Sequence, residues 1–133
     1  MFLIQKRMEI AYAHHLNLPY ESKCRNIHGH NGIVTIYCKA QELDPETEMV
    51  IDFTILKKQI HDKLDHGFIN EILPDINPTA ESMAKWICDT INGTIFNDDN
   101  SEMRFRSCIC YRVDFQESEG NIATYILDEE AVK

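Results

Sequence analysis

The alternation of apolar and polar residues predicts two long strands in the first third of the chain. Residues 2–14 form the first strand, which ends at Ala13-His14, and residues 28–41 form the second. Pro19 and a polar cluster predict a loop over residues 16–27 between them. In the second strand, one face would carry Val34, Ile36, Cys38 and Ala40, and the other Ile33, Thr35, Tyr37 and Lys39.

Two amphipathic helices are predicted in the middle of the chain. The first covers residues 53–66, with Asp52 as its N-cap and Gly67 as the residue that ends it. The second opens at Asn77-Pro78-Thr79, whose first or third residue can cap it, and Gly93 would stop it. The apolar faces would be Phe53, Leu56, Ile60 and Leu64 in the first helix and Met83, Ala84, Ile87, Cys88 and Ile91 in the second.

Strands return toward the C-terminus. Residues 103–117 alternate most clearly, and a turn at Glu119-Gly120-Asn121 leads to a last strand over residues 122–128. This order predicts an α+β fold in a single domain, residues 1–133, with a four-stranded antiparallel sheet and two helices on one face. The bare face and open edges favour oligomers. The faces of the third strand would be Phe105, Ser107, Ile109, Tyr111, Val113 and Phe115, and Arg104, Arg106, Cys108, Cys110, Arg112 and Asp114.

The net charge of −9 limits the kinds of molecule that the protein is expected to bind. It comes from 22 acidic and 13 basic side chains, which argues against general binding to nucleic acid or anionic membranes. No apolar run is long enough to span a bilayer, and the N-terminal apolar run is too short for a signal peptide. The five cysteines are irregularly spaced, so we expect reduced thiols and a cytoplasmic protein.

The sharpest chemical feature is His28-Gly29-His30. In an extended segment the two histidines point to the same side, as two nitrogen ligands of one zinc ion must. Catalytic zinc usually takes three protein ligands and keeps one position open, and His14 or His15 could supply the third. Only one of these two neighbours can share the face of the pair. The alternative is a set of surface histidines on a polar loop.

Three further groups are candidates for chemistry. Cys24 precedes His28 by four residues, and a thiol near a bound cation can act as a base or nucleophile. Its alternatives are a fourth zinc ligand in a closed structural site and an ordinary loop cysteine. Asp65-His66 is a candidate proton relay, unless His66 merely neutralises the helix C-terminus. Glu117 could accept two hydrogen bonds from an amino-pyrimidine edge, or be a solvated turn residue.

Six motifs follow one another between residues 8 and 127: Ala13-His14-His15-Leu16, Cys24 with His28-Gly29-His30-Asn31, Met49-Val50-Ile51-Asp52-Phe53, Leu64-Asp65-His66 with Ile69-Asn70, Pro78-Thr79-Ala80-Glu81, and Glu117-Ser118. In this order they resemble the 6-pyruvoyl-tetrahydropterin synthase and 6-carboxy-tetrahydropterin synthase superfamily. The chain departs from the family pattern at several positions. These are His15 in place of arginine, Gly32 in place of an aromatic, Ile10 and Tyr12 in the strand before the first histidine, Glu48 in place of glycine and Ser118 in place of threonine.

The resemblance implies the tunnelling fold, whose order of strands and helices agrees with the order predicted above. It also implies a homo-oligomer of trimeric barrels that often stack in pairs as hexamers, and a Zn²⁺ cofactor. The implied site consists of His14, His28 and His30 as metal ligands, Cys24, Asp65 and His66 as catalytic residues, and Glu117, Thr79 and Glu81 as substrate-binding residues.

The short spacing between Cys24 and His28 resembles that of the bacterial 6-carboxytetrahydropterin synthases of queuosine and 7-deazaguanine biosynthesis. The expected activity is that of a zinc-dependent lyase without a redox cofactor. It would convert 7,8-dihydroneopterin triphosphate to 6-carboxy-5,6,7,8-tetrahydropterin, acetaldehyde and triphosphate. The 6-pyruvoyl synthase reaction on the same substrate is the alternative within the family. A non-catalytic zinc-binding module is the alternative from another class.

Overall fold

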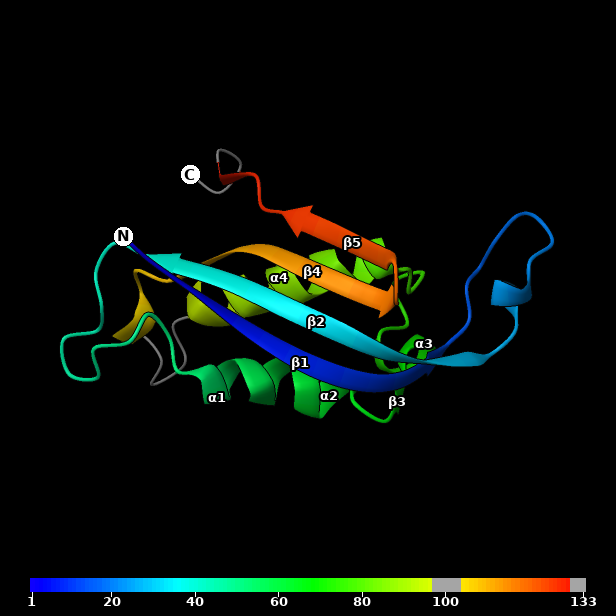
Figure 1. Ribbon diagram of the computed structural model, residues 1–133, viewed down its shortest axis with the longest axis horizontal. Helices are drawn as coiled ribbons and strands as arrows, with labels where there is room; N and C mark the ends of the chain where they lie inside the picture. Colours follow the sequence, from blue (N-terminus) through cyan, green and yellow to red (C-terminus); the bar gives the residue numbers. More distant parts are fainter. Residues whose placement is uncertain (97–103, 130–133) are drawn as a thin grey trace.

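The computed structural model describes residues 1–96 and 104–129, which form one sheet with helices packed on it (Figure 1). The strand order is β3-β1-β2-β4-β5, and β3 is the only one of these that runs parallel to its neighbour. The strands are β1 (Phe2–His14), β2 (His28–Ala40), β3 (Gly67–Phe68), β4 (Ile109–Ser118) and β5 (Asn121–Ile126). The helices are η1 (Lys23–Arg25), α1 (Phe53–Leu56), η2 (Lys57–His61), α2 (Asp62–Leu64), α3 (Ile69–Ile72) and α4 (Ala80–Phe96).

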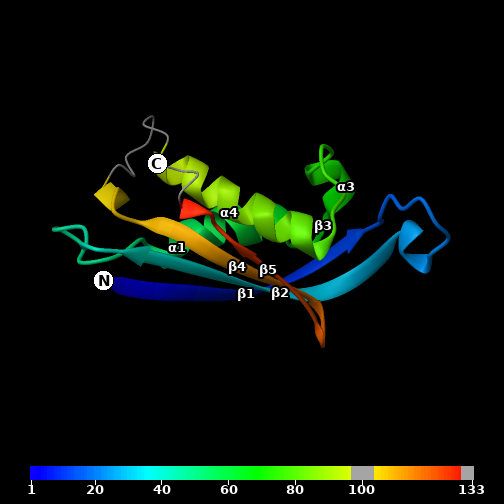
Figure 2. The ribbon, with the colours of Figure 1, turned by 90° about the horizontal axis from the view of Figure 1, so that it is seen from above.

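The predicted α+β architecture is confirmed, with one strand more than expected. β1, β2, β4 and β5 are the four predicted antiparallel strands, and Figure 2 shows the labelled helices together on one side of the sheet. The extra strand, β3, pairs only Gly67 with Tyr12 and Phe68 with Ala13. Alternation cannot reveal a strand of two residues. Within the described residues, no helix combines the length and apolar content needed to cross a membrane.

The hydrophobic core lies between the sheet and the helices. Val34, Ile36 and Cys38 of β2 share one face, as the alternation predicted, and this face is fully buried. α1, η2 and α2 follow one another without a break after the Asp52 N-cap, whose side chain accepts a hydrogen bond from Thr54 N–H at 2.9 Å. The helical residues buried against the sheet include Leu56, Ile60 and Leu64 in this stretch, and Met83, Ala84, Ile87, Cys88 and Ile91 in α4.

Both predicted helix ends are wrong, each for its own reason. The first helical stretch ends at Leu64, and the positive φ, 60°, falls on His66 and not on Gly67. Gly67 serves close packing instead, because a Cβ there would lie 2.9 Å from the carbonyl oxygen of Leu64. α4 runs through Gly93 to Phe96, because its buried apolar face outweighs the roughly 1 kcal/mol that an internal glycine costs.

The third long strand starts later than predicted and changes phase along its length. The first residue of the predicted strand lies outside the described residues, and β4 itself begins at Ile109. Tyr37 of β2 lies opposite Arg112, whereas its neighbour Cys38 lies opposite Cys110, which leaves an extra residue in β4. Such a β-bulge reverses the alternation. The predicted faces are therefore wrong before the bulge, where Cys110 is buried in the core.

Candidate metal centre

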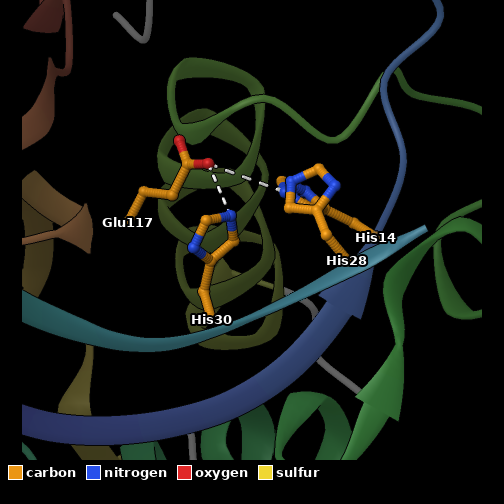
Figure 3. Close-up of side chains that lie close together, drawn as sticks. All are labelled: His14, His28, His30 and Glu117. Atoms are coloured by element: carbon orange, nitrogen blue, oxygen red, sulfur yellow. Dashed lines mark ion pairs between the residues drawn. The ribbon is translucent and has the colours of Figure 1, made fainter. Parts of the chain in front are cut away.

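Three histidines meet at the end of the β1–β2 ladder (Figure 3). His14 of β1 lies directly opposite His28 of β2, and His30 follows two residues later in the same strand. The ring centroids are 4.6 Å apart for His14 and His28, 5.1 Å for His14 and His30, and 4.9 Å for His28 and His30. The ring of His15 instead lies 6.0 Å from that of Phe68. The group therefore includes His14 and not His15.

Backbone carbonyl groups determine which nitrogen of two of these rings faces the group. Nδ1 of His14 lies 2.8 Å from the carbonyl oxygen of Pro78, and Nδ1 of His28 lies 2.7 Å from that of Asn26. Because a carbonyl oxygen only accepts, each Nδ1 carries the proton and donates it, which leaves a lone pair on Nε2. Histidines that bind metals are oriented by outer hydrogen bonds of this kind.

Glu117 of β4 completes a group of four. Its Oε1 lies 2.7 Å from Nε2 of His30 and 3.7 Å from Nε2 of His14, as the dashed lines in Figure 3 show. Both of these Nε2 atoms are buried. That of His14 has no hydrogen-bond partner, which costs about 1–3 kcal/mol, whereas that of His30 is held only by its contact with the Glu117 carboxylate. One ligand atom from each of the four residues lies within 4.8 Å of the others. Imidazole nitrogens that converge beside a carboxylate fit a divalent cation, and zinc accepts this set of donors.

The electrostatics of His14 suit a metal ligand. Its side chain is 1% exposed, and this burial lowers its pKa, while the hydrogen bond to the Pro78 carbonyl acts in the opposite direction. The neighbouring His28 lowers the pKa of His14 further. A histidine must be unprotonated to bind a metal, so the lowered pKa keeps His14 competent at neutral pH.

Tyr12 and Gly32 shape the inner wall of the group together. The Tyr12 ring centroid lies 5.2 Å from that of His14 and 5.5 Å from that of His30, and its hydroxyl is buried without a hydrogen-bond partner. Burial, with a smaller contribution from Glu117, raises the pKa of Tyr12 and keeps the phenol neutral. A Cβ on Gly32 would lie 3.0 Å from Cε1 of Tyr12. The missing side chain at Gly32 thus makes room for the tyrosine ring, and both positions depart from the family pattern.

Cys24 lies outside this group of four. It is the middle residue of the one-turn η1, where its N–H donates to Oγ of Ser22 at 3.2 Å and its carbonyl accepts from Leu16 N–H at 2.8 Å. It is half-buried, whereas the other four cysteines are buried. Among the described residues, the candidate metal ligands that converge are the three histidines and Glu117. This arrangement speaks against a site closed by Cys24, and its predicted catalytic role stays a prediction.

Asp65 and His66 form a pair beside the outer edge of β1. Asp65 Oδ1 accepts from Ala11 N–H at 2.9 Å, and Asp65 Oδ2 lies 2.7 Å from Nδ1 of His66. These two hydrogen bonds lower the pKa of Asp65. The carboxylate holds the proton of His66 on Nδ1 and leaves Nε2 free on a side chain that is 84% exposed. The pair has the geometry of a proton relay, although it too lies outside the group of four.

The predicted substrate-binding residues lie at the start of α4 and the end of β4. Thr79 caps α4, because its Oγ1 accepts a hydrogen bond from Ser82 N–H at 3.1 Å. Glu81 and Glu117 line one surface pocket together with Ala80 and residues 120–124. The sequence placed Glu117 at the end of a strand but gave no sign that it faces the histidines. That proximity depends on the pairing of β2 with β4, which no local motif encodes.

The chain is similar to known proteins over most of its length. The sequence profile of a family described as 6-pyruvoyl tetrahydropterin synthase matches residues 3–128. A 6-carboxy-5,6,7,8-tetrahydropterin synthase of Synechocystis is 36% identical over 94 residues, which cover 65% of this chain and 72% of the relative. Its Bacillus subtilis counterpart is 30% identical over 106 residues, or 74% and 71%. The human 6-pyruvoyl tetrahydrobiopterin synthase is 27% identical over 140 residues, or 92% and 89%.

Solved structures bear on the fold alone. The 6-pyruvoyl tetrahydropterin synthase of Caenorhabditis elegans superposes with a TM-score of 0.70 at 24% identity, and the alignment covers 96% of both chains. That of Plasmodium vivax superposes with a TM-score of 0.61 at 18% identity and covers 94% of this chain and 98% of the other. These likenesses confirm the predicted tunnelling fold of the single chain.

Proposed function

Because the chain belongs to the 6-pyruvoyl tetrahydropterin synthase family, we propose that it is a 6-carboxy-5,6,7,8-tetrahydropterin synthase. The reaction would consume 7,8-dihydroneopterin triphosphate and water and release acetaldehyde and triphosphate, as a step in queuosine and 7-deazaguanine biosynthesis. The observation that carries the proposal is the meeting of His14, His28 and His30 around a buried Nε2 of His14 that has no hydrogen-bond partner. The two bacterial relatives and the short spacing between Cys24 and His28 support this member of the family.

The resident metal would be Zn²⁺, held by Nε2 of His14, His28 and His30. When bound, it would act as a Lewis acid toward the two hydroxyl groups of the substrate side chain. The protein contributes the fixed orientation of the ligands, since the carbonyl groups of Pro78 and Asn26 hold two of the rings. His14 also anchors the group to the start of α4, because Pro78 lies two residues before that helix.

Proton transfer would fall to two groups that lie outside the four residues of the candidate metal centre. Cys24, as a thiolate, would remove the carbon-bound proton of the substrate side chain. Its partial exposure suits this role, whereas the buried cysteines have no access to a substrate. His66 would donate or accept a second proton at Nε2, with its tautomer held by Asp65. Both residues are polar groups on segments that flank β1, the strand that carries His14.

Glu117 would anchor the pterin by accepting two hydrogen bonds from its amino-pyrimidine edge. The pocket that it shares with Glu81 at the start of α4 supports this role. Thr79 would contribute mainly through the cap that fixes the first turn of that helix. The Glu117 carboxylate lies against His30, so its side chain would have to turn away from the histidines to reach the pterin.

The active form would be a homo-oligomer of trimeric barrels, which stack as hexamers. The exposed apolar side chains support this proposal, since Phe2 and Leu3 lie on β1 and Ile122 and Ile126 on β5, the strands near the two edges of the sheet. Paired edges would also cover the strand groups that an isolated sheet leaves open. The net charge of −9 argues against nucleic-acid and anionic-membrane partners, and the irregularly spaced cysteines support a cytoplasmic enzyme.

Incubation of the zinc-loaded protein with 7,8-dihydroneopterin triphosphate tests the proposal. We expect a product with the mass of the carboxy-pterin, together with acetaldehyde and triphosphate. Triphosphate without acetaldehyde would instead indicate the 6-pyruvoyl synthase reaction, which the 92% coverage by the human relative keeps as the second candidate. Bound zinc without any turnover would favour a non-catalytic module, with Glu117 as the fourth ligand of a closed site.

A further inference from the structure

Two asparagine side chains pair with the chain just beyond His14 as a neighbouring strand would. Asn70 Oδ1 accepts from His15 N–H at 2.9 Å, and its Nδ2 donates to the His15 carbonyl at 3.0 Å. Asn77 makes the same two bonds to Asn17, at 2.9 Å and 3.0 Å. A carboxamide offers one acceptor and donors in one plane, so each side chain satisfies both backbone groups of one residue. The two side chains act as clamps, because they continue the hydrogen bonding of the chain beyond the last β1–β2 pair.

The segment that these asparagines hold is also bonded to Cys24. Leu16 lies between the two clamped residues, and its N–H donates to the carbonyl oxygen of Cys24 at 2.8 Å. η1, which contains Cys24, has only three residues, so its placement depends on bonds to its surroundings. A shift of residues 15–17 would therefore move the turn that carries the thiol.

The chain segment that carries the clamps Asn70 and Asn77 also holds one ligand of the metal centre. Asn77 immediately precedes Pro78, whose carbonyl oxygen accepts from Nδ1 of His14 at 2.8 Å. Asn70 lies in α3, directly after β3, which pairs with β1. The connection between the two long helical stretches thus holds His14 and the segment bonded to Cys24 at the same time.

We propose that Asn70 and Asn77 are positioning residues, which keep the Cys24 turn at a fixed place relative to the metal centre. This inference rests on the proposed function, in which Cys24 acts on a substrate held at the histidines. The structure offers a matched control for a purely structural role. Asn92 makes the same pair of bonds to Cys110, at 2.8 Å and 2.9 Å, inside the core.

The experiment compares Asn70→Ala, Asn77→Ala and the double variant with Asn92→Ala. In each zinc-loaded protein we would measure the rate at which iodoacetamide alkylates Cys24, the zinc content, kcat and KM. We expect the double variant to keep its zinc, to change the alkylation rate severalfold and to lose about ten- to a hundredfold in kcat, because small misplacements of reacting groups are costly. Asn92→Ala should lower the melting temperature and leave the alkylation rate and kcat unchanged.

The conservative variants Asn70→Asp and Asn77→Asp keep the acceptor and lose the donor, so we expect intermediate effects on the alkylation rate and kcat. A folded double variant with wild-type alkylation rate and kcat would overturn the inference. Equal effects from Asn92→Ala would also overturn it, because the clamps would then act through global stability. If the wild type shows no turnover but alkylation shifts only in the Asn70 and Asn77 variants, the proposed reaction fails and the positioning role stands.

Discussion

The helix-facing side of the β1–β2 ladder differs sharply between its two ends. At one end, His14 and His28 lie opposite each other, and Nε2 of His14 is buried without a hydrogen bond. Further along, Val34, Ile36 and Cys38 are fully buried against helices. Burial of an unpaired polar atom lowers stability, whereas burial of apolar area raises it. The histidine end therefore suits a ligand, and the apolar stretch supplies the stability that offsets its cost.

The cysteines show the same division. Cys24 is half-buried in a short turn, whereas the other four lie in the core. Hydrogen bonds with the thiols of Cys108 and Cys110, together with burial, raise the pKa of Cys38. A thiol in such surroundings is a packing group and not a nucleophile. Of the five cysteines, four are buried in the core, so Cys24 is the candidate reactive thiol.

The largest expected effect comes from His28→Ala at the polar end. Loss of one ligand should weaken zinc binding by more than about a hundredfold, since even outer-shell changes cost ten- to a hundredfold. Competition with a chelating dye would measure the affinity. The unfolding free energy of the metal-free protein should change by less than about 1 kcal/mol, because His28 is only partly buried. The matched control is His15→Ala, which should bind zinc like the wild type. Tight zinc binding by His28→Ala would contradict the assigned ligand set.

The second-largest effect is expected from Ile36→Ala in the apolar core, which should lose stability. Because Ile36 is fully buried, its truncation should lower the unfolding free energy by about 2–5 kcal/mol. Urea unfolding of the metal-free protein would measure this loss. The zinc affinity of the folded variant should stay within about threefold of the wild type, a difference of about 0.65 kcal/mol. Thr35→Ala, on the opposite face of β2, serves as the control. Coupled loss of zinc affinity in Ile36→Ala would show that the two ends are not independent.

Much of the contrast between the histidine end and the apolar stretch could be predicted from the sequence. The long strands follow from alternation, and His28 and His30 from their spacing, because both signals are local. Local pattern left the choice between His14 and His15 open, and the register of β1 against β2 decides which one joins the group.

Other features were beyond prediction because they depend on tertiary contacts. Glu117 reaches the histidines only through the pairing of β2 with β4, and the bulge in β4 inserts one residue into an otherwise regular pattern. Gly93 continues α4 because packing outweighs local propensity. Asn77 was predicted as a candidate cap, but it bonds to Asn17, sixty residues away in the chain.

A smaller effect should arise where the two regions meet, at Gly32. A methyl group there would lie 3.0 Å from the Tyr12 ring and 3.1 Å from the carbonyl oxygen of Gln116, so Gly32→Ala should cost about 1–3 kcal/mol. Urea unfolding of Gly32→Ala, Tyr12→Ala and the double variant would measure the coupling. We expect the alanine at position 32 to cost less without the tyrosine ring, by about 0.5 kcal/mol or more. Strict additivity would show that the two positions are not coupled.

The smallest expected effect is on the pH dependence of the metal-free protein. The pKa of His14 is lowered on folding from about 6.5, so below that pH the unfolded chain takes up the proton first. The contribution of His14 should therefore make stability fall as the pH drops from about 6.5 toward the lower, folded-state pKa. Urea unfolding between pH 7 and pH 5, values that bracket the ordinary histidine pKa of about 6.5, would measure the slope. His14→Gln should flatten it, and an equally steep profile in that variant would contradict the assignment.

The zinc content and turnover of Cys24→Ala test most directly the claim that the polar end is an open catalytic site. The described ligand group contains the three histidines and Glu117 but not Cys24. We therefore expect the purified variant to keep its zinc at the wild-type ratio while its turnover of 7,8-dihydroneopterin triphosphate falls by at least about a hundredfold. Loss of zinc from this variant, or wild-type turnover with zinc in place, would contradict it.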